Sequence, residues 1–556
     1  MNGSVLIQGL WRATSRSLFT ALTLVAIVQA AQAAGDPVVM TREGSVQGTT
    51  ERGVDVFRGI PYAAPPVGEL RWLPARPVRP WTGLRPALDF GPACPQRIVA
   101  DLTENSDQVQ SENCLTLNVW TPDVAGPKRP VMVWIHGGAL AIGSDRNTWY
   151  DGARLAARGN LLVVTIQYRL GLLGFLDLSR IGGSEYAQSG NLGILDEIAA
   201  LRWVRKNIAA FGGDPDNVTV FGESAGGASV AVLLATPLAR GLFNKGIIES
   251  MSPQLGEPRE PQSESARALM EAAGVHTIKG LRGLSVGRLF AAERKAVAAH
   301  RDAGDFTTKI DHVLLNANAL KLIEEGKLAH VPVIIGTNLD EMNFFDTIED
   351  FRQREKPRAL LSKQLVGAFG RQRAADIEKA YFSDEKGSYG DEVIALNSGI
   401  FFRIPSIRLA EASSASQPTW MYLFTYRSTS TYRPYASSHA MELPFVFDNL
   451  EAQDAIAFTG RAPDRKRLSE QIQDAWIAFA RAGNPNAPGL PRWPRYDPHS
   501  RATMEFGEVT HVVDDPLRER RRVFNDLAFN GTSPAPKQYA PLMFANGGGS
   551  TRLASK

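Results

Sequence analysis

The sequence predicts an α/β fold, in which a large and mostly parallel central sheet carries helices on both faces. Strand-like apolar runs alternate with helical segments through the first half of the chain, which is the pattern of such a sheet. The composition, 44% apolar and 21% charged, is that of an ordinary globular protein. The length of 556 residues lets one large sheet carry long insertions.

The expected strands are short apolar runs rich in β-branched residues, at residues 131–135, 161–167, 218–221, 245–248, 331–335 and 420–425. Apolar residues at helical spacing predict a helix over residues 192–211, which the pair Gly212-Gly213 ends. A last long helix is expected over residues 467–482, before Gly483-Asn484-Pro485.

Two mostly helical and charged stretches, residues 256–325 and 346–415, interrupt this alternation. We interpret them as helical insertions over the sheet within a single domain that spans residues 34–530. Insertions on the carboxyl side of the strands are where an α/β sheet builds its substrate cavity. Residues 531–556 are rich in Pro, Gly and Ser, and this composition predicts a poorly ordered tail.

The N-terminus has the pattern of a secretory signal peptide. Arg12 and Arg16 precede an apolar run over residues 18–28, and small residues follow at Ala31-Gln32-Ala33. We therefore expect residues 1–33 to be removed and the protein to be exported, either to a periplasm or fully secreted. A retained membrane anchor is the alternative, although the run is short for a membrane span. No later segment is expected to be long and apolar enough to cross a bilayer.

Charge gives no indication of a polyanionic partner. Removing residues 1–33 takes away two arginines and no acidic residue, so that 59 basic and 58 acidic residues remain. A near-neutral chain without a basic run gives no reason to expect nucleic acid or an anionic membrane as a partner. Nothing in the sequence indicates an oligomeric state.

The chain has two cysteines, Cys94 and Cys114, in one short stretch. In an exported protein this predicts a single disulfide that closes a loop of about twenty residues, worth on the order of 3 kcal/mol in the chain-entropy model. Two free thiols are the alternative. A metal site made by two cysteines without a nearby histidine is not expected.

The strongest local motif is Gly222-Glu223-Ser224-Ala225-Gly226, a G-x-S-x-G sequence. A strand-like apolar run precedes it and a helix-like run of small residues follows it, so the context is strand, tight turn and helix. Such a turn holds the serine in a strained conformation with its hydroxyl exposed, and the glycines leave room for the neighbouring elements. The motif predicts Ser224 as a catalytic nucleophile.

A serine hydroxyl is a weak nucleophile at neutral pH, so it needs a base that is oriented by an acid. In hydrolases with this turn, the chain order is serine, acid, histidine. Of eight histidines, His439, His499 and His511 come late enough. His499 lies in a turn and His511 in a short β-like run, whereas His439 leads into an apolar segment and is the best of the three. Order alone leaves all three open.

An acyl-transfer oxyanion needs backbone N–H donors that are in place before the reaction. One candidate is the amide of Ala225, directly after the predicted nucleophile. Others are expected from the loop His136-Gly137-Gly138-Ala139-Leu140, because it carries glycines and follows an early strand.

Several motifs occur together between about Gly44 and Asp497. They lie at residues 57–66, 112–120, 136–140, 221–227, 483–486 and 493–494. In this order, they make the chain resemble the type-B carboxylesterase and cholinesterase family of α/β-hydrolases. The resemblance covers most of the chain after the predicted signal peptide and implies the α/β-hydrolase fold.

The resemblance also implies the acid and the histidine. Residues 336–341 are similar to the family segment whose final glutamate orients the histidine, so Glu341 takes that role, with Asp340 as the alternative. Residues 439–442 are similar to the family's histidine segment, which implies His439. Together with Ser224, these residues complete a Ser-His-Glu triad.

Further roles follow from the same resemblance. It implies oxyanion donors at Gly138, Ala139 and Ala225, a second buried serine near the triad at Ser250, and the Cys94–Cys114 disulfide. Three residues depart from the family pattern: Ala139 stands where glycine is usual, Met251 where glycine is common, and Asn113 where an acidic residue or glycine is usual.

One difference bears on the substrate. Cholinesterases place a tryptophan in the first disulfide loop, where its ring holds a quaternary ammonium group. Residues 95–113 contain no aromatic residue, so a choline ester is not expected. Phe344 and Phe345, just after Glu341, are expected to line a cavity for apolar acyl or alcohol groups.

We therefore expect a serine carboxylesterase that hydrolyses a small-molecule ester through an acyl-enzyme on Ser224, without a cofactor or metal. The same machinery acting on an amide, carbamate or lactone is the first alternative, since these reactions pass through similar intermediates. A non-catalytic binding protein on the same fold is the second. Relatives of that kind typically lose a triad residue, and here all three positions are occupied.

Overall fold

The computed structural model describes residues 35–97, 109–252, 255–257, 262–299, 306–345, 358–382, 389–432 and 435–525. The predicted signal peptide and the predicted tail lie outside these residues.

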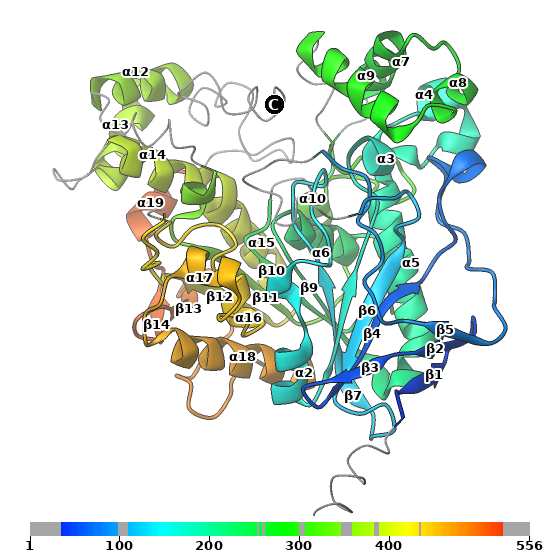
Figure 1. Cartoon of the computed structure of the whole chain (residues 1–556). Helices are drawn as coiled ribbons and strands as arrows, with labels where there is room; N and C mark the ends of the chain where they lie inside the picture. Colours follow the sequence, from blue (N-terminus) through cyan, green and yellow to red (C-terminus); the bar gives the residue numbers. More distant parts are fainter. Residues whose placement is uncertain are drawn as a thin grey trace, which may run out of the picture.

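An eleven-stranded sheet forms the centre of the protein, in the order β14-β13-β12-β11-β10-β9-β7-β8-β6-β4-β3 (Figure 1). Neighbouring strands from β8 through β7 and β9 to β13 pair in parallel, and the pairs at both margins are antiparallel. The predicted α/β fold is confirmed. The strands are β3 (Thr49–Glu51), β4 (Val54–Pro61), β6 (Thr116–Thr121), β7 (Arg129–Ile135), β8 (Leu162–Ile166), β9 (Gly213–Glu223), β10 (Lys245–Glu249), β11 (Val333–Asn338), β12 (Thr419–Phe424), β13 (Ala502–Phe506) and β14 (His511–Asp514). A separate small sheet holds β1 (Val38–Met40), β2 (Ser45–Gln47) and β5 (Leu84–Pro86).

Helices cover both faces of the sheet, and β7 shows why. Its side chains alternate between two hydrophobic cores, because successive residues of a strand point to opposite faces. Val133 packs in the core that includes Leu201 of α5, whereas Trp134 packs in the core that includes Trp476 of α18. The first face is covered mainly by α5 (Leu192–Asn207), α6 (Ala225–Ala235), α10 (Ala319–Glu324) and α15 (Ile404–Ser414), and the second by α2 (Ala153–Gly159), α16 (Leu443–Val446) and α18 (Arg465–Ala482).

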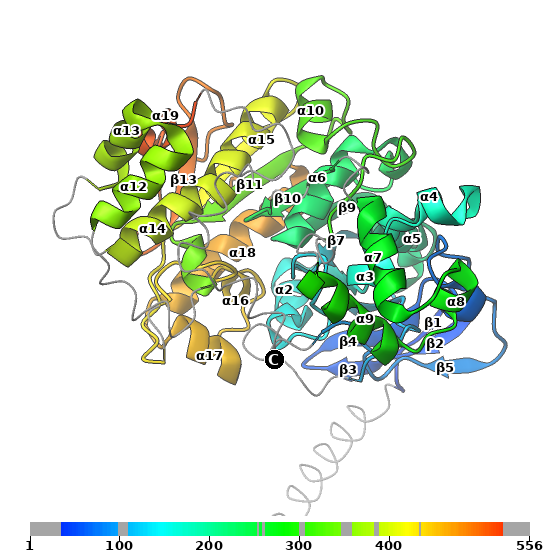
Figure 2. The same ribbon diagram turned by 90° about the horizontal axis from the view of Figure 1, so that it is seen from above.

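Two further groups of helices fall within the stretches that the sequence marks as insertions. One follows β10 and contains α7 (Gln262–Ala273), α8 (Ile278–Arg282) and α9 (Val286–Ala299). The other follows β11 and contains α12 (Arg358–Phe369), α13 (Arg371–Tyr381) and α14 (Tyr389–Ser398). Both chain segments leave the carboxyl ends of parallel strands. The two groups lie at the same end of the sheet, on opposite sides of it (Figures 1 and 2). The other α-helices within the described residues are α3 (Gly171–Phe175), α4 (Ser179–Gly182), α17 (Gln453–Thr459) and α19 (Arg518–Arg522).

The expectation that no segment after the predicted signal peptide is long and apolar enough to cross a bilayer is wrong. Within the described residues, the continuous helix Gly390–Ser414 is long and apolar enough to cross a membrane. However, 83% of its apolar window is buried inside the protein, where α15 packs on the sheet. A core helix of this kind passes the same test as a membrane span.

The predicted disulfide is present. Cys94 and Cys114 are bonded, with their Cα atoms 5.1 Å apart, and both are fully buried. The bond ties the segment before residue 98 to the start of β6.

Candidate active site

Ser224 lies in the turn between β9 and α6, at the carboxyl edge of the sheet. Its backbone has φ 57° and ψ −120°, a strained conformation for a residue with a side chain. The glycines around it are required by close packing. A Cβ on Gly226 would lie 2.1 Å from the carbonyl oxygen of Ile135, and one on Gly222 would lie 2.7 Å from the carbonyl of Gly226. Only glycine at these positions lets α6 begin so close to β7.

The backbone of Ser224 is also bonded to the end of the next strand, β10. Its N–H donates to the carbonyl of Glu249 at 2.9 Å, and its carbonyl accepts from the N–H of Ser252 at 3.0 Å. These two bonds hold the backbone on both sides of the turn, and they thereby fix the position of the Ser224 side chain relative to the sheet. The residue is partly exposed.

His439 and Glu341 are in direct contact. The ring Nδ1 of His439 lies 2.7 Å from Oε2 of Glu341, and the N–H of His439 donates to the Glu341 carbonyl at 3.1 Å. The other carboxylate oxygen of Glu341 accepts from the N–H of Asn338 at 2.7 Å. Glu341 begins the short 3-10 helix η8 (Glu341–Phe344) just after β11 and is fully buried. The carboxylate is therefore held from both sides and faces the imidazole.

The alternatives left open by the sequence lie elsewhere. The carboxylate of Asp340 accepts from the N–H of Ser437 at 3.4 Å and lies 3.6 Å from Nη1 of Arg427. His499 is exposed in a turn, and His511 is exposed on β14. Among these candidates, the structure brings together Glu341 and His439.

Glu223, the residue before Ser224, is a member of the site that sequence reasoning missed. Its Oε1 lies 2.9 Å from Nε2 of His439. The contact lacks the angle of a hydrogen bond, so both atoms remain without a hydrogen-bond partner in the described part of the chain. No hydrogen bond joins the Ser224 hydroxyl to the His439 ring among these residues either. The sequence offered one indication of this role, namely the position of Glu223 directly before Ser224 in the motif.

The electrostatics favour a protonated imidazole. Burial lowers the pKa of His439, but Glu223 and Glu341 outweigh that effect and raise it well above its usual range. Burial also raises the pKa of Glu223, and the nearby histidine partly offsets this. The two neighbouring carboxyl groups therefore favour the protonated form of the imidazole.

Two more buried glutamates, Glu249 and Glu442, complete what we call the carboxyl cluster: Glu223, Glu249, Glu341 and Glu442. Burial raises the pKa of Glu249 to about 8 and that of Glu442 well above its usual range. Glu249 Oε1 accepts from the indole N–H of Trp476 at 2.7 Å. The Asn338 amide donates to Glu442 and, at 2.7 Å, to the carbonyl of Ser438. These bonds link the cluster to the segment that carries His439.

Ser250, expected near the triad, is fully buried, and its hydroxyl lies 3.5 Å from Oε1 of Glu442. Its N–H donates to the carbonyl of Gly336 at 2.9 Å. Ser250 thus contacts the carboxyl cluster, and its assignment to a substrate pocket stays a prediction.

The loop with the expected oxyanion donors lies against the nucleophile turn. A Cβ on Gly137 would lie 3.0 Å from the Cβ of Ser224. Gly138 and Ala139 both have positive φ, 107° and 55°, and in the described part of the chain neither N–H donates a hydrogen bond. Ala225 is the first residue of α6, where an N–H has no acceptor within the helix. All three amides are therefore available to a ligand.

Three phenylalanines surround the imidazole of His439. Its ring centroid lies 6.1 Å from that of Phe344, 5.2 Å from that of Phe345 and 4.7 Å from that of Phe402. Sequence reasoning expected the first two and missed Phe402, which lies in the π-helical turn η10 (Gly399–Arg403) between α14 and α15. Phe345 is 42% exposed, which leaves an aromatic surface beside the site.

Within the described residues, no group of three or more His, Cys, Asp or Glu side chains is arranged to hold a metal ion. The carboxyl cluster is bonded instead to protein donors and to the imidazole.

The model of the carboxylesterase family matches residues 35–524. This chain belongs to the type-B carboxylesterase family. It is 39% identical to the para-nitrobenzyl esterase of Bacillus subtilis over 87% of this chain and 98% of that protein. It is 35% identical to a phenmedipham hydrolase of Pseudarthrobacter oxydans, over 87% and 97% of the two chains. The solved structure of a Geobacillus stearothermophilus carboxylesterase is 36% identical, with a TM-score of 0.78 over 88% of this chain and all of that one.

The family and these relatives show that the protein is a serine carboxylic ester hydrolase, and that small-molecule esters are its class of substrate. The predicted family and enzyme class are confirmed.

Proposed function

We propose that this carboxylesterase works through a Ser224–His439–Glu341 triad and an acyl-enzyme on Ser224. The observation that carries the proposal is the buried 2.7 Å contact between His439 and Glu341, with Nε2 of the same ring reaching the residue next to Ser224. Nδ1 is thereby occupied, and Nε2 is left for the serine hydroxyl.

In the first half of the reaction, His439 accepts the Ser224 proton through Nε2 as the hydroxyl attacks the ester carbonyl. Glu341 holds the ring orientation and stabilises the imidazolium. The N–H groups of Gly138, Ala139 and Ala225 bind the tetrahedral oxyanion. His439 then protonates the leaving alcohol, and the acyl group remains on Ser224. In the second half, His439 activates water, which releases the acid.

The contact between Nε2 and Glu223 has a consequence for the resting enzyme. Before catalysis, the His439 ring must lose its proton, and its Nε2 must turn from Glu223 to the Ser224 hydroxyl. Glu223 and Ser224 are neighbours in the chain. Catalytic hydrogen bonds are often poorly aligned before substrate binds. Substrate in the oxyanion loop would favour the aligned state, because only that state allows attack.

The substrate proposed for the site has an apolar acyl or alcohol group. Phe344, Phe345 and Phe402 present aromatic faces around the imidazole. The same machinery can act on an amide, carbamate or lactone, and a relative described as a phenmedipham hydrolase shows that other small molecules are hydrolysed within the family. Rates on matched p-nitrophenyl esters and p-nitroanilides would rank the two bond types.

Two measurements test the triad. We expect Ser224→Ala to lower kcat for p-nitrophenyl butyrate by about 10⁴-fold or more. A fluorophosphonate probe should label one site in the wild-type protein, and peptide mapping by mass spectrometry should place that label on Ser224. Wild-type hydrolysis by the alanine variant would overturn the proposal. Lack of labelling would favour the alternative of a catalytically inactive binding protein.

We also propose that the protein is exported through its first 33 residues. The buried Cys94–Cys114 disulfide supports this, because disulfides persist in oxidising compartments. The N-terminal sequence of protein isolated from its host should then begin at Ala34.

A further inference from the structure

A cavity lies beside the chain segment that precedes Glu341, where Asn338 and Leu339 line it. Its volume is about 380 Å³, counting the mouth that opens to solvent. It is formed where the ends of β11 and β12 meet η10, α15 and the segment at α19. Most of its wall is apolar, but three arginines, Arg403, Arg520 and Arg521, also line it, and Arg403 and Arg521 are buried. The apolar wall residues are Leu339, Ala395, Ile404, Ile407, Leu423, Pro516 and Leu517.

Arg403 is buried, and its hydrogen bonds are few for a group with five N–H donors. Nη1 makes two long contacts, 3.4 Å to the Thr337 hydroxyl and 3.5 Å to the Tyr422 carbonyl. Nε is buried without a partner, and in the described part of the chain no carboxylate lies within 4 Å of the guanidinium. Burial lowers the pKa of Arg403 to about 10, so the group still carries its charge at neutral pH.

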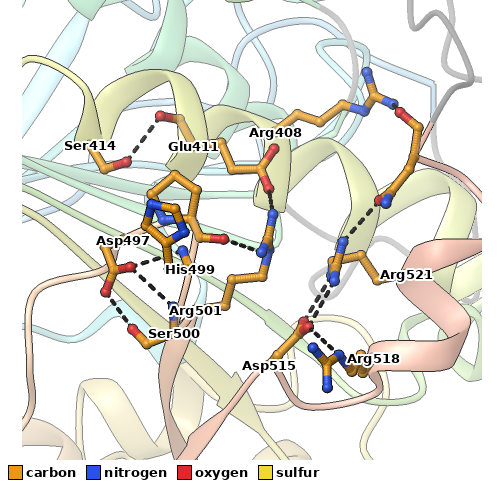
Figure 3. A network of polar contacts seen from close by, with 12 residues as sticks. Arg408, Glu411, Ser414, Asp497, His499, Ser500, Arg501, Asp515, Arg518 and Arg521 are labelled. Carbon is orange, nitrogen blue, oxygen red and sulfur yellow. Dashed lines mark hydrogen bonds and ion pairs between the residues drawn. The ribbon is translucent and has the colours of Figure 1, made fainter.

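Two neighbouring arginines, by contrast, have carboxylate partners (Figure 3). Arg521 makes two bonds to the carboxylate of Asp515, at 2.8 and 2.7 Å, and Arg501 lies 2.6 Å from Oε1 of Glu411. Arg521 is nearly as buried as Arg403, and Arg501 is more exposed. Of these three arginines, Arg403 alone has no carboxylate partner in the described part of the chain.

An unpaired buried charge beside an open cavity points to a ligand of opposite charge, because burial of an isolated ion is costly. A guanidinium matches the planar geometry of a carboxylate. The apolar wall matches an alkyl chain, and it gives a bare inorganic anion nothing to contact. Two more arginines line the cavity: Arg520, whose guanidinium stacks 5.1 Å from the ring of Tyr381, and Arg521, which is paired with Asp515.

We propose that this cavity is a binding site for a short-chain aliphatic carboxylate, held by Arg403. The carboxylate would pair with the guanidinium, and its alkyl chain would lie along Leu339, Ile404 and Ile407. None of the three triad residues lines this cavity, but Asn338, whose N–H donates to Glu341, does.

Isothermal titration calorimetry of the full chain tests the site, with sodium butyrate, acetate and chloride at constant ionic strength in sodium fluoride. We expect saturable binding of one butyrate, tighter than acetate and chloride. Arg403→Met should weaken it at least about tenfold, since it keeps the length of the side chain and removes the charge. Arg501→Met, which removes a paired arginine outside the cavity, should bind as the wild type does.

The outcomes separate the possible sources of binding. Butyrate bound in the active site would bind Arg403→Met with unchanged affinity, and that result would overturn the proposal. Chloride binding more tightly than butyrate would overturn the assignment of a carboxylate, as would no saturable binding by 100 mM. If Arg403→Met does not fold, a crystal structure of the wild type with butyrate decides the matter. Density for a carboxylate next to Arg403 supports the site, and an empty cavity contradicts it.

Discussion

The two halves of the active site are held by different kinds of interaction. Ser224 is fixed by backbone bonds to β10 and by glycines that pack against carbonyl oxygens. His439 is fixed by side chains, with Glu341 on Nδ1 and Glu223 near Nε2. The first half therefore depends on shape and is insensitive to charge, whereas the second depends on charge and responds to pH. Substitutions that change only shape or only charge can separate the two.

Among the substitutions that separate the two halves, the largest effect is expected from removing the charge that orients the histidine. Glu341→Gln keeps the shape of the side chain but cannot stabilise the imidazolium, and its amide can select the wrong ring tautomer. We expect kcat for p-nitrophenyl butyrate to fall by roughly 10³- to 10⁴-fold. Asp340→Asn is the matched control, because Asp340 contacts Ser437 and Arg427 instead of His439. A larger loss in the control than in Glu341→Gln would reverse the assignment of the acid.

A change of shape alone should act next most strongly. In Gly226→Ala, the new methyl group would lie 2.1 Å from the Ile135 carbonyl, so β7 and α6 must separate. We expect kcat/KM to fall by roughly 100-fold or more, because a displacement of about 1 Å at a nucleophile has that effect. Gly287→Ala, in α9, is the control, since nothing lies within 4 Å of its new Cβ. Equal activity of both variants would show that the turn tolerates movement.

The same contrast explains what could be predicted from the sequence. The Ser224 half is contiguous in the chain, as a strand, a turn and a helix, so local pattern was enough. The histidine half joins distant segments, and the acid required a family resemblance. Glu223 and Phe402 were missed because their roles arise from contact with His439 and not from a pattern of their own. Arg403 was missed because the walls of its cavity come from four separate regions.

Element positions show the same limit. The run at residues 331–335 was expected as a strand, but β11 begins at Val333 and continues to Asn338. Pro332 has no N–H for the ladder, which accounts for the later start. The polar residues after Gly213 did not suggest a strand, yet β9 begins there and its first residue pairs with Arg129.

A smaller effect, on pH dependence, is expected from Glu223. The charge of this residue favours the imidazolium, so the active, neutral His439 forms only at higher pH in the wild type. Glu223→Gln removes that charge, and the acidic limb of the kcat/KM profile should move to lower pH by about one unit or more. At pH 7, we expect activity to change by less than about tenfold. Glu293→Gln, which removes a buried carboxylate that pairs with Arg97, should leave the limb in place. An unmoved limb in Glu223→Gln would mean that the contact does not control the histidine.

The smallest effect on activity is expected at Glu249, where stability should respond instead. Only the backbone carbonyl of Glu249 contacts Ser224, and its side chain accepts from Trp476, a bond that glutamine can keep. The folded-state pKa is raised to about 8, so the carboxyl's contribution to stability is complete below its ordinary pKa of 4.5 and is lost as the pH rises to about 8. Glutamine does not titrate. The free energy of unfolding of Glu249→Gln minus that of the wild type should therefore increase from pH 5 to pH 8, by about 1–4 kcal/mol.

Thermal unfolding of the two proteins at pH 5 and pH 8 measures this difference, and kcat at pH 7 checks that the nucleophile turn is unaffected. A Tm difference that is the same at both pH values would show that the Glu249 side chain is already ionised in the folded protein. In that case, the carboxyl cluster would hold a third negative charge in addition to those of Glu223 and Glu341, and this charge would lie next to the Ser224 turn. A pH-dependent gain in Tm with unchanged kcat would instead keep the two halves separate, since the buried carboxyl group beside the Ser224 backbone could then be replaced without consequence for the reaction.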